Sequence, residues 1–374
     1  MKKIIMIVSL SLIMFMVGCT SNRKSFYRLD LGNAFNTISE LQIVDEEKMI
    51  PVSKILKIQK DSTAILVNLD KKFNVLERAN FNYLTDLKKV NNKAGISPVV
   101  VDSEVYELVK CAHSFSLKEG YEDIFDISLG ALSFLWDFNK RIKEESTTIP
   151  TEEEINNALL KTDQTKIVFN DLDTSIYLEE VGMALDLGAV VKGYAAQKIK
   201  EYLMEEEISS AVINVGRNIV LLGLNKGSEW NVKIQTPFVQ IGHDGYFFGS
   251  ITTYNKALVT SGVYEKYIKD NNDKLYHHLL NPKTGYPFDN GLLAVSIITE
   301  DSTYADIMST FVFGLGLVEG FRFVEEDEAL EAVFVYESEE EKQIYVSSGL
   351  LSSFTFNEEV SNLNYVYKGL MDYE

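Results

Sequence analysis

The sequence predicts an α+β fold, with a mixed sheet core and packed helices in a single module of two subdomains. Strand-like segments dominate the chain after residue 166, and the alternation of Trp230, Val232 and Ile234 is a clear example. Helical spacing of apolar residues interrupts these strands, and mixed strands with scattered helices are typical of α+β architecture. No internal repeat or Pro/Gly/Ser-rich linker divides the chain. We therefore expect one continuous body.

Two helices are predicted before residue 120. Leu69, Phe73 and Leu76 recur at helical spacing and predict a helix within 69–84. A second helix is expected directly after Asp102, because an aspartate before an apolar helical pattern is a good N-cap.

The polar stretch at 143–154 is the best candidate for the boundary between the subdomains. Thr151 and Glu154 within it have the spacing of a capping box, which predicts a third helix. Further helices are expected at 190–206 and 305–313. Strands are expected at 166–169, 175–178, 211–215, 219–222, 230–234, 247–253, 293–299, 332–336 and 343–346.

Composition excludes several classes of protein. The chain has 374 residues, 46% of them hydrophobic, which is ample for a packed core. Its 36 Lys and Arg against 55 Asp and Glu give a net charge of −19. Nucleic acid is a poor partner for such a chain, because binding to phosphate backbones needs clustered positive charge. The two cysteines form no C-x-x-C pair that would indicate zinc.

The N-terminus has the layout of a secretory signal. Two lysines precede an apolar run, and Gly18 stands directly before Cys19. The placement of Cys19 is similar to a bacterial lipobox, so we expect a signal peptide at 1–18, lipidation of Cys19, and a tether at 19–34. The alternative is an uncleaved N-terminal anchor. Either way, the body is expected outside the cytoplasm on a cell membrane.

The stretch DLGAVVKGYAA at 186–196 is the most informative motif. A Gly-containing turn that enters a helix leaves backbone N–H groups free, and these can hold an anionic ligand. Asp186 and Lys192 bracket this turn. The alternative is a purely structural role, with Asp186 as a helix N-cap and Lys192 as a solvated lysine.

The stretch YADIMST at 304–310 contains a candidate metal site. Asp306 and Thr310 are four residues apart in a helical pattern, so their oxygens share one face. A carboxylate, a hydroxyl, a carbonyl and water form a hard-oxygen site of the kind that Mg²⁺ accepts. The alternative is a capping box formed by Thr303 and Asp306.

The stretch HHLLNPKTGYP at 277–287 contains a candidate general base. His277 and His278 are adjacent, and neighbouring side chains in an extended segment point to opposite faces, so only one should face a pocket. A purely structural role for both is the alternative.

Together with TSGVYEKY at 260–267, IFDISLGALSFLWDF, AVINVGRNI and TDLKKVN, these blocks resemble the ApbE family of FAD:protein FMN transferases, over roughly 35–354. The resemblance implies an ApbE-like α+β domain, assigned to 35–356, with a C-terminal tail at 357–374. It also implies FAD as substrate, Mg²⁺ as cofactor, and transfer of FMN to a Thr or Ser hydroxyl of an extracytoplasmic flavoprotein, with release of AMP.

The same resemblance assigns site residues. His278 matches the general base of the family. The metal ligands would be Asp306, Thr310, the carbonyl of Ala189 and the position of Ser309. The FAD contacts would come from Phe35, Phe81, Ile124, Phe125, Asp126, Asp186, Lys192 and Leu280.

The chain departs from the family pattern at several positions, one of which is GYED in place of the more usual Gly directly before Ile124. Gly216-Arg217 stands where relatives commonly have Gly-Gly, and Asn281 stands where Asp often precedes Pro. Two other functions use the same features: a metal-dependent FAD pyrophosphatase, in which water replaces the acceptor hydroxyl, and a lipoprotein that only binds flavin.

Overall fold

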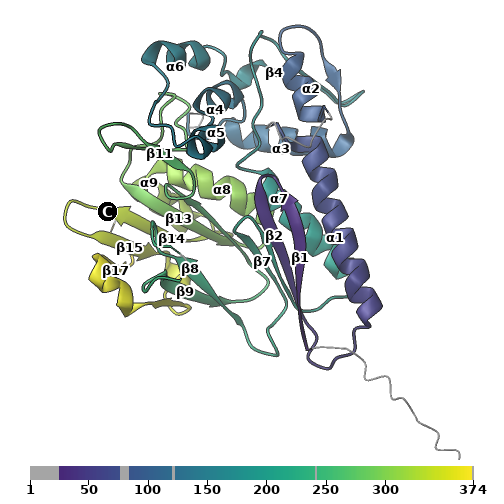
Figure 1. The fold of residues 1–374 in the computed structure, drawn as a ribbon, viewed down its shortest axis with the longest axis vertical. Helices are drawn as coiled ribbons and strands as arrows, with labels where there is room; N and C mark the ends of the chain where they lie inside the picture. Colours follow the sequence, from purple (N-terminus) through teal and green to yellow (C-terminus); the bar gives the residue numbers. More distant parts are fainter. Residues whose placement is uncertain (1–24, 76–83, 120–122, 241, 373–374) are drawn as a thin grey trace, which may run out of the picture.

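A large sheet forms the centre of the molecule in the computed structural model (Figure 1). The structure describes residues 25–75, 84–119, 123–240 and 242–372, and within them this sheet has nine strands. Neighbouring strands are antiparallel, except that β15 and β17 are parallel. The strands lie in the order β1 (Phe26–Ala34), β2 (Thr37–Val44), β6 (Ala211–Val215), β7 (Asn218–Leu222), β10 (Ala257–Gly262), β13 (Leu292–Thr299), β14 (Glu331–Glu337), β15 (Lys342–Val346) and β17 (Tyr365–Gly369).

Four helices pack on this sheet and build its main apolar core. They are α1 (Val52–Phe73), α7 (Val191–Glu205), α8 (Ser302–Leu315) and α9 (Leu317–Glu326), which contact β1, β6, β13 and β14 respectively. All eight residues of β13 are buried. A smaller sheet of β8 (Trp230–Gln235), β9 (Phe247–Thr253) and β16 (Phe354–Phe356) contributes to the same core. The central strands are therefore rigid supports for the loops at their ends.

A second group of elements lies above the large sheet in Figure 1. It contains α2 (Asp86–Asn92), α3 (Ser103–Ser116), α4 (Gly130–Trp136), α5 (Phe138–Lys143), α6 (Glu152–Leu159), the 3₁₀ helix η1 (Gln164–Lys166), the small sheet of β3 (Val99–Val100), β5 (Ser175–Leu178) and β4 (Ile167–Asn170), and the hairpin of β11 (Tyr267–Lys269) and β12 (Leu275–His277).

Trp136 ties part of this upper group to the segment that follows β12. The indole lies in a separate apolar cluster with Phe138, Ile155 and Tyr276, and its Nε1 donates to the carbonyl of Gly285 at 2.8 Å. This cluster fixes the segment that carries the two adjacent histidines.

The predicted fold class is confirmed, and most predicted elements are present. Asp102 caps α3 by accepting from the amide of Glu104, and Thr151 and Glu154 form the expected capping box of α6. All nine predicted strands occur, within two residues of the expected bounds. The elements that were not predicted are the strands β1, β2, β3, β10, β11, β12, β16 and β17 and the helices α2, α4, α5 and α9.

The helix predicted within 69–84 is wrong in its position. The helix α1 ends at Phe73, where Asn74 turns extended, and it begins at Val52. Its buried face starts at Ile55 and Ile58, so Leu69 and Phe73 are only its last two turns. Residues 76–83, which include Phe81, lie outside the described part of the chain.

The predicted tether and the predicted C-terminal tail both contribute a strand to the large sheet. Phe26–Ala34, within the predicted tether, forms β1, whose apolar residues alternate with polar ones and whose partner is β2. The stretch 357–372 forms the 3₁₀ helix η3 (Glu358–Leu363) and β17, and a further 3₁₀ helix, η2 (Ser348–Leu350), precedes it. Cys19 lies outside the described residues. Among those described, none of the helices combines the length and the apolar character needed to cross a bilayer.

Candidate active site

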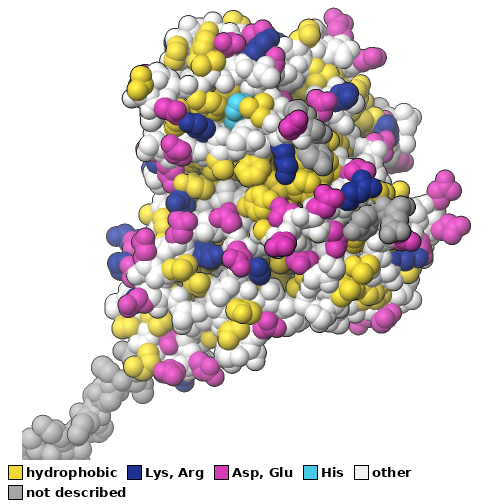
Figure 2. Space-filling model, turned by 180° about the vertical axis from the view of Figure 1, so that it is seen from behind, with side chains coloured by type: hydrophobic (Ala, Val, Ile, Leu, Met, Phe, Trp, Pro, Cys, Tyr) yellow, Lys and Arg dark blue, Asp and Glu magenta, His cyan; other side chains and the backbone are white. Residues whose placement is uncertain are grey.

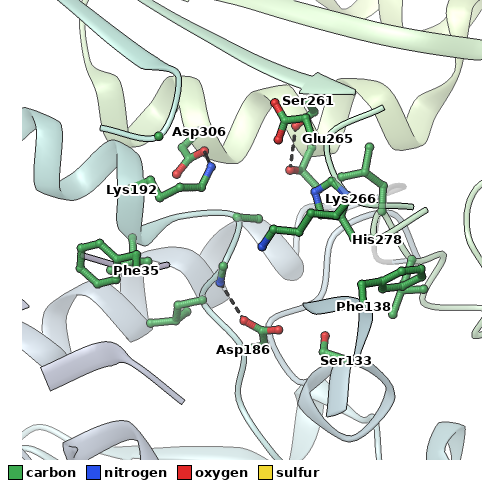
Figure 3. A pocket seen from close by; sticks show the side chains of 18 of the residues that line it. Phe35, Ser133, Phe138, Asp186, Lys192, Ser261, Glu265, Lys266, His278 and Asp306 are labelled. Atoms are coloured by element: carbon green, nitrogen blue, oxygen red, sulfur yellow. Dashed lines mark hydrogen bonds and ion pairs between the residues drawn. The ribbon is translucent and has the colours of Figure 1, made fainter. Parts of the chain in front are cut away.

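A cavity of about 420 Å³ lies where the upper group meets the large sheet, which is within the usual range for small-molecule sites. Its walls come from segments far apart in the sequence (Figure 3). They include the β1–β2 turn, the loop before α4, the loop before α7, the β6–β7 turn, the end of β10, the segment after β12, and α8. Among the predicted site residues, the cavity is lined by Phe35, Ile124, Phe125, Asp126, Asp186, Ala189, Lys192, His278, Leu280, Asp306 and Thr310.

Asp306 lies on α8, and its carboxylate is held by the start of α7. Its Oδ2 accepts from the amide of Gly193 at 2.8 Å, and its Oδ1 lies 3.5 Å from the ammonium of Lys192. The free N–H groups at a helix start suit a carboxylate. A Cβ at Gly193 would lie 2.2 Å from the carbonyl oxygen of Ser302, so the close approach of the two helices requires glycine there.

The capping alternative for Asp306 is wrong. Helix α8 is capped by Asp301, which accepts from the amide of Tyr304, and Asp306 lies inside the helix with its side chain 3% exposed. The carboxylate is therefore buried and directed at the cavity. A buried charge is retained only with partners, and Lys192 and the Gly193 amide are these partners.

Lys192 forms the other half of this ion pair. Burial works to lower the pKa of its ammonium, but the carboxylates of Asp306 and Glu265 outweigh burial and raise it. The Lys192 side chain is 25% exposed and pairs with the buried Asp306 carboxylate, which contradicts the alternative of a solvated lysine.

Asp186 shapes the turn before α7 and does not cap the helix. Its Oδ1 accepts from the amide of Gly188 at 2.8 Å, whereas α7 begins at Val191 and has no side-chain cap. Asp186 lines the cavity opposite Lys192 (Figure 3). The turn also directs Ala189 into the cavity wall.

Thr310 and Ser309 have different surroundings, although they are adjacent. Thr310 lines the cavity, and its hydroxyl lies 3.3 Å from that of Ser261 on β10. Ser309 is buried away from the cavity lining, because its hydroxyl donates to the carbonyl of Asp306 and lies 2.8 Å from that of Ser261. The structure therefore brings Thr310, but not the Ser309 hydroxyl, to the cavity.

His277 and His278 point to opposite sides, as the sequence predicts. The Nε2 of His277 donates to the carbonyl of Phe288 at 2.9 Å, and its Nδ1 accepts from the amide of Leu279. Burial lowers the pKa of His277 to about 4. His277 is thus a neutral, structural residue on the core side.

His278 faces the cavity. Its Nδ1 is buried without a hydrogen-bond partner among the described residues. Burial lowers the pKa of His278 well below 6.5, and the nearby ammonium of Lys266 lowers it further. A neutral imidazole with a free ring nitrogen at neutral pH is the form of histidine that can accept a proton.

The remaining predicted FAD contacts line the cavity with both apolar and polar side chains. Phe35 lies in the β1–β2 turn with a φ of 52°, and its amide donates to Asp70. Asp126 accepts from the amide of Ser128 at 2.6 Å, and burial raises the pKa of its carboxyl group. Leu280 is buried in the segment that His278 begins.

Four charged residues of the cavity were not among the predicted site residues: Asp137, Arg217, Glu265 and Lys266. Glu265 and Lys266 follow β10, and Arg217 lies in the β6–β7 turn with a φ of 73°. The Arg217 guanidinium lies 3.9 Å from the Glu265 carboxylate. The adjacent charges of Glu265 and Lys266, between β10 and β11, were a signal that could have found these two residues.

The cavity fits a hard cation such as Mg²⁺. The Asp306 carboxylate, the Thr310 hydroxyl and Ala189 line one cavity, and these residues supply oxygen ligands. In the described part of the chain, no group of three His, Cys, Asp or Glu side chains suited to a metal is found. An ion held here would therefore take further oxygens from water or from substrate phosphates.

A sequence profile of the ApbE family matches residues 35–334. A FAD:protein FMN transferase of Klebsiella pneumoniae is 35% identical over 246 residues, which cover 66% of this chain and 73% of that relative. One of Treponema pallidum is 32% identical over 279 residues, which cover 71% and 74% of the two chains.

Solved structures agree with these matches. The flavin transferase ApbE from Vibrio cholerae has a TM-score of 0.71 and 19% identity, covering 88% of this chain and 99% of that one. The ApbE protein of Thermotoga maritima has a TM-score of 0.70 and 27% identity, covering 87% and 97%. The large mixed sheet and its packed helices are thus those of the ApbE structures. The chain belongs to the ApbE family.

Proposed function

We propose that the protein transfers FMN from FAD to a Thr or Ser hydroxyl of a partner flavoprotein and releases AMP. Its membership of the ApbE family, whose curated relatives are named FAD:protein FMN transferases, makes it a flavin transferase enzyme. One observation carries the finer proposal: a neutral histidine with a free ring nitrogen shares a cavity with an acid and a hydroxyl one helical turn apart. The names of these relatives make FAD the expected substrate.

His278 is assigned the role of general base. The acceptor oxygen attacks the phosphorus of the FMN half, and a new P–O bond forms while the P–O bond of the anhydride breaks. The hydroxyl proton passes to His278, and AMP leaves with the electron pair of the broken bond. A base within hydrogen-bond reach of such a weak nucleophile typically contributes about 10²–10⁴ in rate.

Asp306, Thr310 and the Ala189 carbonyl are the proposed Mg²⁺ ligands. When bound, the ion would neutralise charge that develops on the phosphates. Ser309 is the weaker member of this set, because its hydroxyl is occupied by Ser261 and the Asp306 carbonyl.

Lys192, Asp186 and the apolar wall are the proposed FAD contacts. The Lys192 ammonium stays charged beside Asp306, so it is suited to a phosphate. Phe35, Ile124, Phe125 and Leu280 offer apolar surface in the same cavity, and Asp126 adds a polar group. Phe81 remains a prediction from the resemblance.

We also propose that the protein is lipid-anchored through Cys19 on the outer side of a cell membrane, where its acceptor would reside. The support is the order of charged, apolar and Gly-Cys segments in 1–19. Mass spectrometry of the N-terminal peptide from cells tests this proposal. A diacylated peptide beginning at Cys19 supports it, whereas an unmodified Cys19 within an intact N-terminus contradicts it.

Incubation with FAD and Mg²⁺, with and without an acceptor flavoprotein domain, tests the activity. Flavin fluorescence that stays with the acceptor after denaturation, with an added FMN mass, is expected only with FAD and metal. Free FMN without bound flavin would instead indicate a pyrophosphatase. FAD returned intact, with or without EDTA, would indicate a flavin-binding protein.

A further inference from the structure

Lys266 is a cation in the cavity that the proposed reaction does not yet use. It follows β10 and directly precedes β11, and its side chain lines the cavity. In Figure 3 the ammonium of Lys266 extends into the open centre, on the side that faces Lys192 and Asp186.

The ammonium of Lys266 has no ionic partner among the residues that the structure describes, in contrast to Lys192, which pairs with Asp306. The acids nearby are engaged elsewhere. The Asp186 carboxylate accepts from the Gly188 amide, and the Glu265 carboxylate lies beside the Arg217 guanidinium.

The electrostatic surroundings of Lys266 favour an anion. Burial lowers the pKa of its ammonium, and the positive charge of Lys192 lowers it further, against the opposing effects of Asp186 and Glu265. Two ammonium groups that face one cavity repel each other, and desolvation raises the cost of each charge. A ligand with two negative charges between them would relieve both effects.

The backbone holds Lys266 in place beside the proposed base. Its carbonyl accepts from the amide of His278 at 3.1 Å, and the preceding turn is closed by the Glu265 amide and the Gly262 carbonyl. The lysine is thus attached to the same local frame as His278. A preorganised donor costs less entropy on binding than a mobile one.

We infer that Lys266 binds the phosphate groups of the substrate from the side opposite Lys192, so that the two lysines grip the diphosphate between them. This inference rests on the proposed function only in taking FAD as the ligand. It assigns a phosphate contact to a residue that is not among the predicted site residues. Because Lys266 also borders His278, it places the reacting phosphate next to the proposed base.

Equilibrium binding in EDTA tests the inference without turnover. FAD is titrated into the full-length protein in detergent, flavin fluorescence is followed, and inorganic pyrophosphate is used as a competitor. The variants are Lys266→Met, Lys266→Arg and, as a matched control on the same hairpin, Lys269→Met, which removes an exposed lysine. Thermal melting of each variant reports folding, and Lys266→Gln replaces Lys266→Met if the latter melts early.

Lys266→Met should bind FAD about tenfold to a hundredfold more weakly, because a hydrogen bond to a charged group is lost. Pyrophosphate should displace FAD from the parent protein. It should no longer do so from Lys266→Met. Lys266→Arg should retain most of the affinity, and Lys269→Met all of it. The inference is overturned if a folded Lys266→Met binds FAD as tightly as the parent and pyrophosphate competes equally well on both. That outcome would leave the proposed function untouched. A parent protein that binds no FAD would overturn the proposed function instead.

Discussion

The core side and the cavity side of the segment at 277–278 hold polar groups in different ways. On the core side, the Nε2 of His277 donates to the carbonyl of Phe288 at 2.9 Å. On the cavity side, the Nδ1 of His278 is buried without a partner among the described residues, and the Lys266 ammonium has no counter-ion there. A buried polar group without a partner costs about 1–3 kcal/mol, and a ligand in the cavity would supply a partner to these two groups.

The two adjacent histidines show this difference most directly. His277 uses both ring nitrogens inside the protein, whereas the Nδ1 of the cavity-lining His278 has no partner among the described residues. The same chemical group therefore serves structure on one side of the strand and is available for chemistry on the other. Substitutions on the cavity side should change activity, and those on the core side should change stability.

The largest effect is expected for His278→Gln. Transfer of FMN should fall by about 10²–10⁴, because the proposed base is lost, while the free energy of unfolding at pH 7 stays within about 1 kcal/mol of the parent. Single-turnover kinetics and urea unfolding measure the two quantities. His243→Gln, at an exposed histidine, is the control. Parental transfer rates in His278→Gln would remove the assignment of the base.

The next effect is expected for Asp306→Asn. An amide oxygen can still accept from the Gly193 amide, but the negative charge that would hold Mg²⁺ is gone. Turnover should fall about a hundredfold or more, and higher Mg²⁺ should restore it only in part. Rates measured across a Mg²⁺ titration check this. Asp301→Asn, at the N-cap of the same helix, should retain the parental rate. A parental rate and Mg²⁺ dependence in Asp306→Asn contradict the metal site.

On the core side, we expect low pH to reduce the stability of the protein through His277. The pKa of His277 is about 4 in the folded protein against 6.5 for an ordinary histidine, so only the unfolded chain takes up this proton between those values. The free energy of unfolding should fall as the pH drops below 6.5, with a share of roughly 1–3 kcal/mol at pH 5 from His277. Urea unfolding at pH 7 and pH 5 measures the loss.

In His277→Gln the free energy of unfolding should fall less between pH 7 and pH 5, by the roughly 1–3 kcal/mol assigned to His277. This holds whatever the substitution costs at pH 7. The exposed His243→Gln should leave the difference as in the parent. An unchanged pH dependence in His277→Gln would mean that this histidine does not stay neutral in the folded protein.

The smallest effect is expected for Thr151→Ala at the capping box of α6. The Thr151 hydroxyl accepts from the Glu154 amide, and the Glu154 carboxylate accepts from the Thr151 amide at 2.8 Å. Loss of the cap should cost about 1 kcal/mol of stability and leave FMN transfer unchanged. Thr147→Ala, at an exposed neighbour, should change neither. A loss of transfer in Thr151→Ala with unchanged stability would break the division between core and cavity.

The distribution of surface charge is not related to the division between core and cavity. In Figure 2, Asp and Glu side chains are spread over the face shown and alternate with Lys and Arg. The net charge of −19 is therefore not concentrated in one acidic patch on that face. The acidic composition is consistent with solubility, and it does not indicate where an acceptor protein binds.

Much of the fold follows from local patterns in the sequence. The alternation of Trp230, Val232 and Ile234, the Asp102 cap and the Thr151 capping box are properties of neighbouring residues, and each was predicted. The strand β1 was missed although Tyr27 and Leu29 alternate with polar residues, because the segment was assigned to the tether. The helix α1 was misplaced because only its last two turns were recognised.

The sequence by itself determined which residue types were available: a histidine pair of opposite orientation, an acid and a hydroxyl one helical turn apart, and a glycine turn before a helix. Only the tertiary structure decided which of them meet. The contact of Asp306 with Gly193 spans 113 residues, and Lys266 joins the cavity because its backbone is bonded to that of His278. Long-range packing sets these distances and the loss of solvent that shifts each pKa, and no local pattern contains either.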